Sequence, residues 1–157
     1  MQLRKKDIIK LKIKNNMEVK IVNKSRHRLP EYETPNSAGM DIKANIDEPY
    51  KLPARSSIVI PTGLYISLPD GYEATIRSRS GLAFKYDITA FHGLIDADYR
   101  GEIKVKLFNH SDNDFLIHPG ERIAQLKIAP VAKVVWNEVS ELDETERGSG
   151  GFGSTGK

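Results

Sequence analysis

Residues 103–107 read Ile-Lys-Val-Lys-Leu, with an apolar residue at every second position and a lysine at each place between. Successive side chains of a β-strand point to opposite faces, so this stretch predicts a strand with one buried and one wet face. The same alternation recurs at 19–21, 40–46, 64–68, 72–76, 115–117, 126–128 and 134–136. Turn residues separate these runs, as in Pro69-Asp70-Gly71 and His118-Pro119-Gly120. Many short strands joined by turns predict an all-β sandwich or barrel.

The chain of 157 residues is long enough for one domain. One short helix is expected from Gly81 to Tyr86, with Ser80 as its N-cap. We expect a basic extension at 1–16, a β-barrel domain at 17–137, and an acidic connection with a glycine-rich arm at 138–157. Residues 138–146 hold five acidic residues and no basic one, and five of the residues at 147–157 are glycine.

Composition excludes several classes of protein. No apolar run is longer than three residues, so no membrane-spanning helix is expected, and the lack of cysteine excludes disulfides and thiolate zinc sites. Residues 1–28 contain ten lysines and arginines against two acids, while residues 29–157 contain fourteen against nineteen. The body is therefore mildly acidic, and we expect no nucleic-acid binding by it. The N-terminus lacks the apolar core of a secretory signal, so a cytoplasmic protein is expected, or a nuclear one in a eukaryote.

Four segments contain residues suited to chemistry, although each is also typical of an ordinary turn or strand. Arginines and hydroxyls at 77–81 precede the predicted helix and could grip phosphate. Asp96, within the segment 93–102, could be a general base or a turn residue. Gln125 could contact a ligand or pair within a strand. The tail from Arg147 to Gly156 could be a closing lid or an unstructured end.

In order along the chain, these four segments and a fifth at 37–41 resemble the five motifs of the homotrimeric dUTP pyrophosphatase (dUTPase) family. The motifs correspond to residues 37–41 (Ser-Ala-Gly-Met-Asp), 79–83 (Arg-Ser-Gly-Leu-Ala), 93–102, 120–125 and 147–156. The resemblance extends from about Val19 to the end. It implies a jelly-roll-like β-barrel subunit of the β-clip type, in a homotrimer that exchanges C-terminal arms. It also implies Mg²⁺-dependent hydrolysis of dUTP to dUMP and pyrophosphate, which limits uracil in DNA and supplies dUMP for dTMP synthesis.

The resemblance assigns a role to each matching residue. Asp96 would be the catalytic base that activates water, and Tyr99 would lie against the deoxyribose. Asp41 and Gln125 would act mainly through water near the metal, which is itself held mostly by substrate phosphates. The phosphates would be held by Arg79, Ser80 and Gly81, and the uracil edge would be read by the main chain of Ala90, Phe91 and Gly93. The arm would close over the nucleotide from another subunit through Arg147, Phe152, Gly153, Ser154 and Thr155.

Two other functions are considered. The related dCTP deaminases, some of them bifunctional, share the fold, but they place a catalytic glutamate in the strand after the aspartate motif, where this chain has Lys106. A non-catalytic nucleotide-binding module would need neither Asp96 nor the closing arm. Many bacterial dUTPases have an asparagine six positions before the aspartate, and this chain has Ala90 there.

Overall fold

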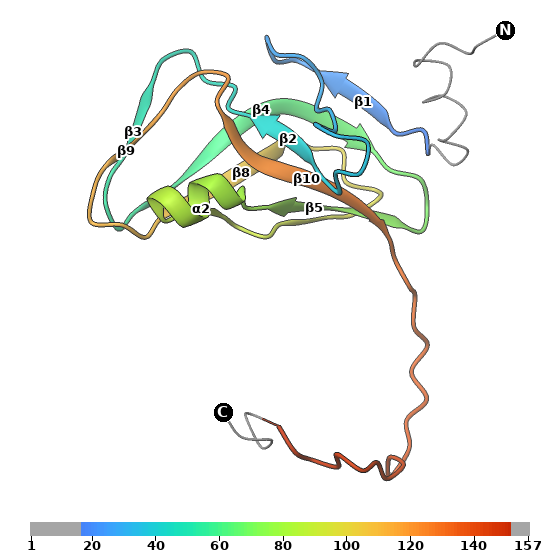
Figure 1. The fold of residues 1–157 in the computed structure, drawn as a ribbon. Helices are drawn as coiled ribbons and strands as arrows, with labels where there is room; N and C mark the ends of the chain where they lie inside the picture. Colours follow the sequence, from blue (N-terminus) through green and yellow to red (C-terminus); the bar gives the residue numbers. More distant parts are fainter. Residues whose placement is uncertain (1–16, 152–157) are drawn as a thin grey trace, which may run out of the picture.

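The computed structural model describes residues 17–151 (Figure 1). The strands are β1 (Lys20–Asn23), β2 (Met40–Lys43), β3 (Tyr50–Leu52), β4 (Ser57–Ser67), β5 (Tyr72–Arg77), β6 (Ile88–Ala90), β7 (Leu94–Ile95), β8 (Ile103–Asn109), β9 (Phe115–Ile117) and β10 (Arg122–Pro130). Within this part of the chain the helix α2 (Ser80–Tyr86) is the only one. The prediction of an all-β fold with one short helix is confirmed.

Two four-stranded antiparallel sheets form the body. One has the order β1-β4-β8-β6 and the other β2-β10-β5-β7, while β3 and β9 form a separate two-stranded sheet. The apolar positions of the alternating strands fill the space between the sheets: Ile103, Val105 and Leu107 on β8 are all buried, as is Leu126 on β10. Lys104 and Lys106 are exposed on the outer face of β8, as the sequence pattern predicts.

Two local predictions were wrong. The helix begins at Ser80, and its N-cap is Arg79, whose extended backbone (φ −82°, ψ 127°) precedes the first turn and whose side chain makes no capping bond. The predicted strand at 134–136 is absent, although its residues alternate as in a strand. After β10 the chain leaves the barrel (Figure 1), so no strand of the described part of the chain lies beside these residues, and Trp136 is 90% exposed.

The described residues include no helix with the length and apolar character needed to cross a membrane.

Candidate active site

A buried carboxylate connects three of the predicted site segments. Asp41 on β2 is 8% exposed and accepts hydrogen bonds from Arg79 Nε (3.2 Å), Arg122 Nη1 (3.1 Å) and Gln125 Nε2 (3.4 Å). The strand order brings them together, because Gln125 on β10 pairs with Asp41 on one side and with Arg77, two residues before Arg79, on the other. We call these four residues the Asp41 cluster: Asp41, Arg79, Arg122 and Gln125.

The Asp41 cluster fixes the guanidinium of Arg79 from two directions. Besides the bond from Nε to Asp41, Nη1 donates to the main-chain oxygen of Arg122 at 3.0 Å. Ser80 and Gly81 follow at the exposed start of α2, and no acceptor among the described residues pairs with their amide groups. Arginine and backbone amide donors at a helix start suit an anionic group such as phosphate.

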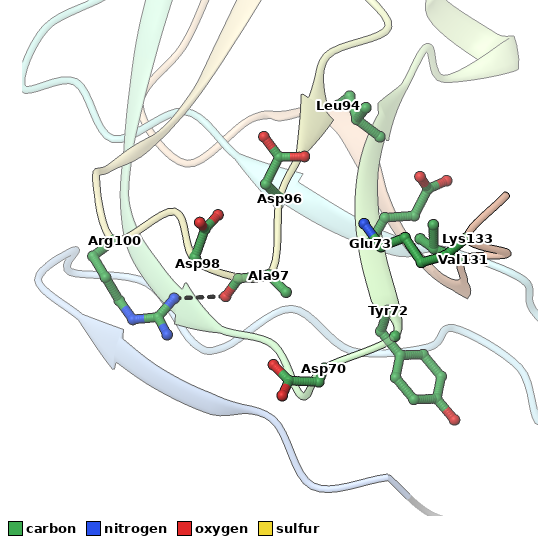
Figure 2. A pocket seen from close by; sticks show the side chains of 11 residues that line it. Asp70, Tyr72, Glu73, Leu94, Asp96, Ala97, Asp98, Arg100, Val131 and Lys133 are labelled. Carbon is green, nitrogen blue, oxygen red and sulfur yellow. Dashed lines mark hydrogen bonds between the residues drawn. The ribbon is translucent and has the colours of Figure 1, made fainter. Parts of the chain in front are cut away.

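Asp96 lies on a tight turn directly after the edge strand β7 (Figure 2). The turn is closed by a hydrogen bond from the Tyr99 amide to the Asp96 oxygen (3.2 Å), and Arg100 Nη1 donates to the Ala97 oxygen (2.7 Å). Asp96 borders a cavity of about 640 Å³ on one side and one of about 250 Å³ on the other. Its side chain is exposed, so the single subunit leaves this carboxylate in water.

We call the smaller cavity the β7–β8 pocket. It lies between the outer edge of β7 and the start of β8, and its volume is about 250 Å³. Tyr99 is part of its wall; the hydroxyl donates to the Glu102 main-chain oxygen (3.2 Å), and the ring lies so close over Gly101 that a Cβ there would collide with it. The predicted site residues Gly93, Asp96 and Tyr99 all line this pocket.

The hairpin before Asp96 already uses most of the main-chain groups that were expected to read a base. Ser78 Oγ accepts from the Ala90 amide (2.9 Å) and donates to the Ala90 oxygen (3.3 Å). The Phe91 amide donates to the Lys106 oxygen (2.8 Å), and the Gly93 oxygen accepts from the Ile76 amide (3.0 Å). Ala90 is buried behind Ser78, and the Phe91 side chain is exposed.

The main-chain amide and carbonyl of Leu94, the next residue of this hairpin, are not used in pairing with β5. Gly93 and Ile76 form a hydrogen-bonded pair, so in the antiparallel register Leu94 and Thr75 form the next, non-hydrogen-bonded pair. The amide and carbonyl of Leu94 therefore point away from β5. Leu94 also lines the β7–β8 pocket.

Within one subunit, Asp96 and the Asp41 cluster are far apart. Asp41 lies on β2 and Asp96 follows β7, which are the opposite edges of the same sheet. Three strand spacings separate them by about 14 Å across the sheet, and the register places Asp96 level with Glu73, about 13 Å along β5 from Arg77. The separation of about 19 Å is too large for one substrate phosphate to touch both groups.

The arm is described only in part. Arg147 is exposed and its Nε donates to the Gly150 oxygen at 2.8 Å, in a segment that leaves the barrel (Figure 1). The predicted arm residues Phe152, Gly153, Ser154 and Thr155 lie outside the described residues.

The donor set suits magnesium bound largely through substrate. Among residues 17–151 no three carboxylates or histidines gather as a metal site. Mg²⁺ commonly keeps several waters and takes only one or two carboxylates together with substrate phosphates. Asp96 is an exposed carboxylate oxygen donor, whereas Asp41 has its oxygens taken by arginine and glutamine. The described residues therefore fit a Mg²⁺ ion that would be held mostly by substrate phosphates and water.

The contacts of three further residues were not predicted from the sequence. Ser78 bonds to Ala90, Arg122 bonds to both Arg79 and Asp41, and Leu94 lines the β7–β8 pocket. The only sequence signal for them is their place within or beside motif segments, because their partners lie on strands distant in the chain.

Comparison with known proteins identifies the family of this chain. The family model for dUTPase matches residues 25–156. A deoxyuridine 5'-triphosphate nucleotidohydrolase of Maricaulis maris is 54% identical over 132 residues, covering 82% of this chain and 87% of the relative, and one of Cytophaga hutchinsonii is 55% identical over 141 residues, covering 88% and 92%. The solved structure of Staphylococcus bacteriophage 80alpha dUTPase with dUPNHPP superposes with a TM-score of 0.78 at 30% identity, covering 90% of this chain and 100% of that one. The chain belongs to the dUTPase family.

Proposed function

We propose that this protein hydrolyses dUTP to dUMP and pyrophosphate; its relatives are named as nucleotidohydrolases of deoxyuridine 5'-triphosphate. The observation that carries the proposal is the β7–β8 pocket, which is lined by Asp96, Tyr99 and Leu94. The Asp41 cluster supplies the matching anion site.

Leu94 gives a reason for uracil selection. Its amide can donate to a uracil carbonyl while its own carbonyl accepts from the uracil N3–H. Cytosine presents an acceptor at N3 and would leave the Leu94 carbonyl unpaired. A site built to hydrogen-bond one partner rejects an analogue that leaves a buried polar group unmet, so dCTP is expected to be a poor substrate.

Tyr99 gives a reason for sugar selection. The ring is held by its bond to the Glu102 oxygen and by its packing over Gly101, so it has little room to withdraw. A ribose 2'-hydroxyl facing this ring would meet carbon atoms with no hydrogen-bond partner. UTP is therefore expected to bind and react less well than dUTP.

We propose that each active site is assembled between subunits of a homotrimer. The separation of about 19 Å within one chain means that Asp96 of one subunit must meet Arg79 of a partner subunit for both to serve one substrate. The partner would also cover Asp96, which is exposed in the single subunit. The chain after β10 leaves its own barrel, which suits an arm that closes over a site elsewhere in the trimer.

In the proposed reaction Asp96 accepts a proton from a water that attacks the α-phosphorus, and the bond from this phosphorus to the bridging oxygen breaks to release pyrophosphate. Arg79 and the amides at the start of α2 bind the phosphate oxygens and offset their charge. Mg²⁺, when bound with the nucleotide, would neutralise phosphate charge and help to orient the chain of phosphates. Asp41 would act by holding Arg79, and Gln125 would contact bound water.

The test of the proposed function is pyrophosphate release from dUTP, measured beside dCTP, dTTP and UTP, with Mg²⁺ and with EDTA. We expect rapid release from dUTP alone and its loss in EDTA. Ammonia release from dCTP would instead indicate a deaminase; Lys106, at the place of the deaminase glutamate, is exposed on β8 beside the Phe108 ring. No hydrolysis of dUTP would refute the proposal.

The shared site is tested by mixing two inactive variants, Asp96→Asn and Arg79→Ala. Unfolded and refolded together, they should form mixed trimers in which some sites combine an intact Asp96 with an intact Arg79 from different chains. Partial recovery of activity supports the shared site. Activity equal to the sum of the two variants, with mixed trimers verified by native mass spectrometry, would refute it. Truncation after Glu146, mixed with Asp96→Asn, tests the arm in the same way.

A further inference from the structure

Strand β4 contains a bulge opposite the start of β8. Its register with β8 shifts between Pro61 and Leu64, so Thr62 and Gly63 have no ladder partners. Gly63 has a φ of +69°, and a Cβ there would lie 2.7 Å from the Ser25 amide nitrogen, so the bulge is packed tightly against the preceding loop. Both bulge residues are buried, and their amide groups need acceptors other than the ladder.

Glu102 supplies the acceptor for both amides. Its Oε1 lies 3.2 Å from the Thr62 nitrogen and 2.9 Å from the Gly63 nitrogen. Its Oε2 lies 4.0 Å from Lys104 Nζ, and the side chain is 19% exposed. The residue that ends the Asp96 turn is thereby anchored to a different strand of the barrel.

The anchored residue also carries Tyr99. The Tyr99 hydroxyl donates to the Glu102 main-chain oxygen, and Tyr99, Glu102 and Asp96 all line the β7–β8 pocket. The position of the Tyr99 ring at the pocket therefore depends on Glu102, and the position of Glu102 depends on its bonds to the two bulge amides. No other side chain bonds to both bulge amides among the described residues.

We propose that Glu102 is a positioning residue for sugar selection, which acts by holding Tyr99 against the 2' position of the nucleotide. This inference rests on the proposed hydrolysis of dUTP. It assigns to Glu102 a role in discrimination between dUTP and UTP that goes beyond stabilising the barrel.

The experiment measures kcat and KM for dUTP and for UTP in the wild type and in three variants. Glu102→Ala removes the acceptor, and we expect kcat/KM for dUTP to fall about 10²-fold, as for a misplacement of about 1 Å. UTP, which already fits poorly, should lose much less, so the dUTP/UTP ratio narrows at least tenfold (about 1.4 kcal/mol). Glu102→Gln keeps an oxygen that can accept from both amides and should retain the ratio within about threefold. Glu102→Asp retracts the carboxylate and should give an intermediate ratio.

Leu52→Ala is the control for general destabilisation, since Leu52 is fully buried but lies on the separate sheet of β3 and β9. It should lower the melting temperature and leave the ratio unchanged. A ratio within about twofold of wild type in Glu102→Ala, or a Glu102→Gln variant as unselective as Glu102→Ala, would overturn the inference. If Glu102→Ala does not fold, Glu102→Asp carries the test by the same criterion. A wild type that does not hydrolyse dUTP would instead overturn the proposed function itself.

Discussion

Replacing Asp41 with asparagine tests whether this carboxylate acts by holding Arg79. Asparagine has one acceptor oxygen where aspartate has two, so the bond from either Arg79 or Arg122 is lost. The bond that remains is made to an uncharged oxygen. A hydrogen bond to a charged group contributes about 1.5–3 kcal/mol to stability. Because the arginine side chains are 23% and 46% exposed, water replaces part of the loss, and the lower figure of about 1.5 kcal/mol applies. For a chain of this size that lowers the melting temperature by roughly 3–6 °C.

The effect on catalysis should be larger than the effect on stability. Without its anchor, the Arg79 guanidinium moves from the place where it meets phosphate, and displacement by about 1 Å costs about 10²-fold in rate. The assay is kcat/KM for dUTP in Asp41→Asn, Arg79→Ala and the double variant, each over a range of Mg²⁺ concentrations. If Asp41 acts through Arg79, the double variant should be no worse than Arg79→Ala alone.

Two results would refute this account of Asp41. Losses that multiply in the double variant would show that Asp41 and Arg79 act independently. Recovery of Asp41→Asn at high Mg²⁺ would show that the carboxylate acts through water near the metal, as the sequence resemblance implied. Arg122→Lys is the matched control, because it disturbs the Asp41 cluster while leaving the Arg79–Asp41 bond and the Arg122 main-chain oxygen in place.

Three further outcomes are expected. Asp96→Asn should keep the fold and nucleotide binding but lose about 10²–10⁴-fold in kcat, as measured by stopped-flow proton release; a rate near wild type would remove Asp96 from the role of base. Gly63→Ala should destabilise the protein by at least about 1 kcal/mol in urea unfolding, because of its φ of +69° and the 2.7 Å approach to the Ser25 nitrogen; unchanged stability would contradict the tight bulge. The hydrogen bond between Lys51 and Asp114 lowers the pKa of Asp114 from 3.8 and raises the pKa of Lys51 from 10.5, so the pair stabilises the fold between these pH values and less below 3.8 or above 10.5. The melting temperature of Asp114→Asn should therefore depend less on pH at both extremes than that of the wild type. Identical pH profiles for the two proteins would contradict a stabilising pair.

The alternation of apolar residues predicted the strands because the pattern itself records which face is buried. Ile103, Val105 and Leu107 needed no knowledge of the partner strand to be placed inward. The alternation from Val134 to Trp136 failed for the same reason: a period of two describes a strand only when another strand lies beside it, and none of the strands described in residues 17–151 does.

The sequence named some residues of the candidate site, but it did not show how they contact one another. Asp41, Arg79 and Gln125 were each predicted, yet the bonds that join them depend on β10 lying between β2 and β5, an order that the linear sequence does not reveal. The reading of the base by the Ala90 main chain stays a prediction, and the sequence did not show that the Ser78 hydroxyl bonds to both main-chain groups of Ala90. Ser78 lies 12 residues before Ala90, so only the fold brings this hydroxyl to them.

Gly101 shows how one selected side chain limits the evolution of another. The three atoms nearest to a Cβ at this position all belong to Tyr99, and the backbone there is not left-handed, so the ring alone excludes a larger residue. Gly101→Ala should therefore be strongly harmful in the wild type and close to neutral once Tyr99 is alanine. The two positions are therefore epistatic, and the effect has a direction. A lineage that loses Tyr99, and with it part of its sugar preference, can accept larger residues at position 101. Each such residue would then clash with a tyrosine at position 99 and oppose its return.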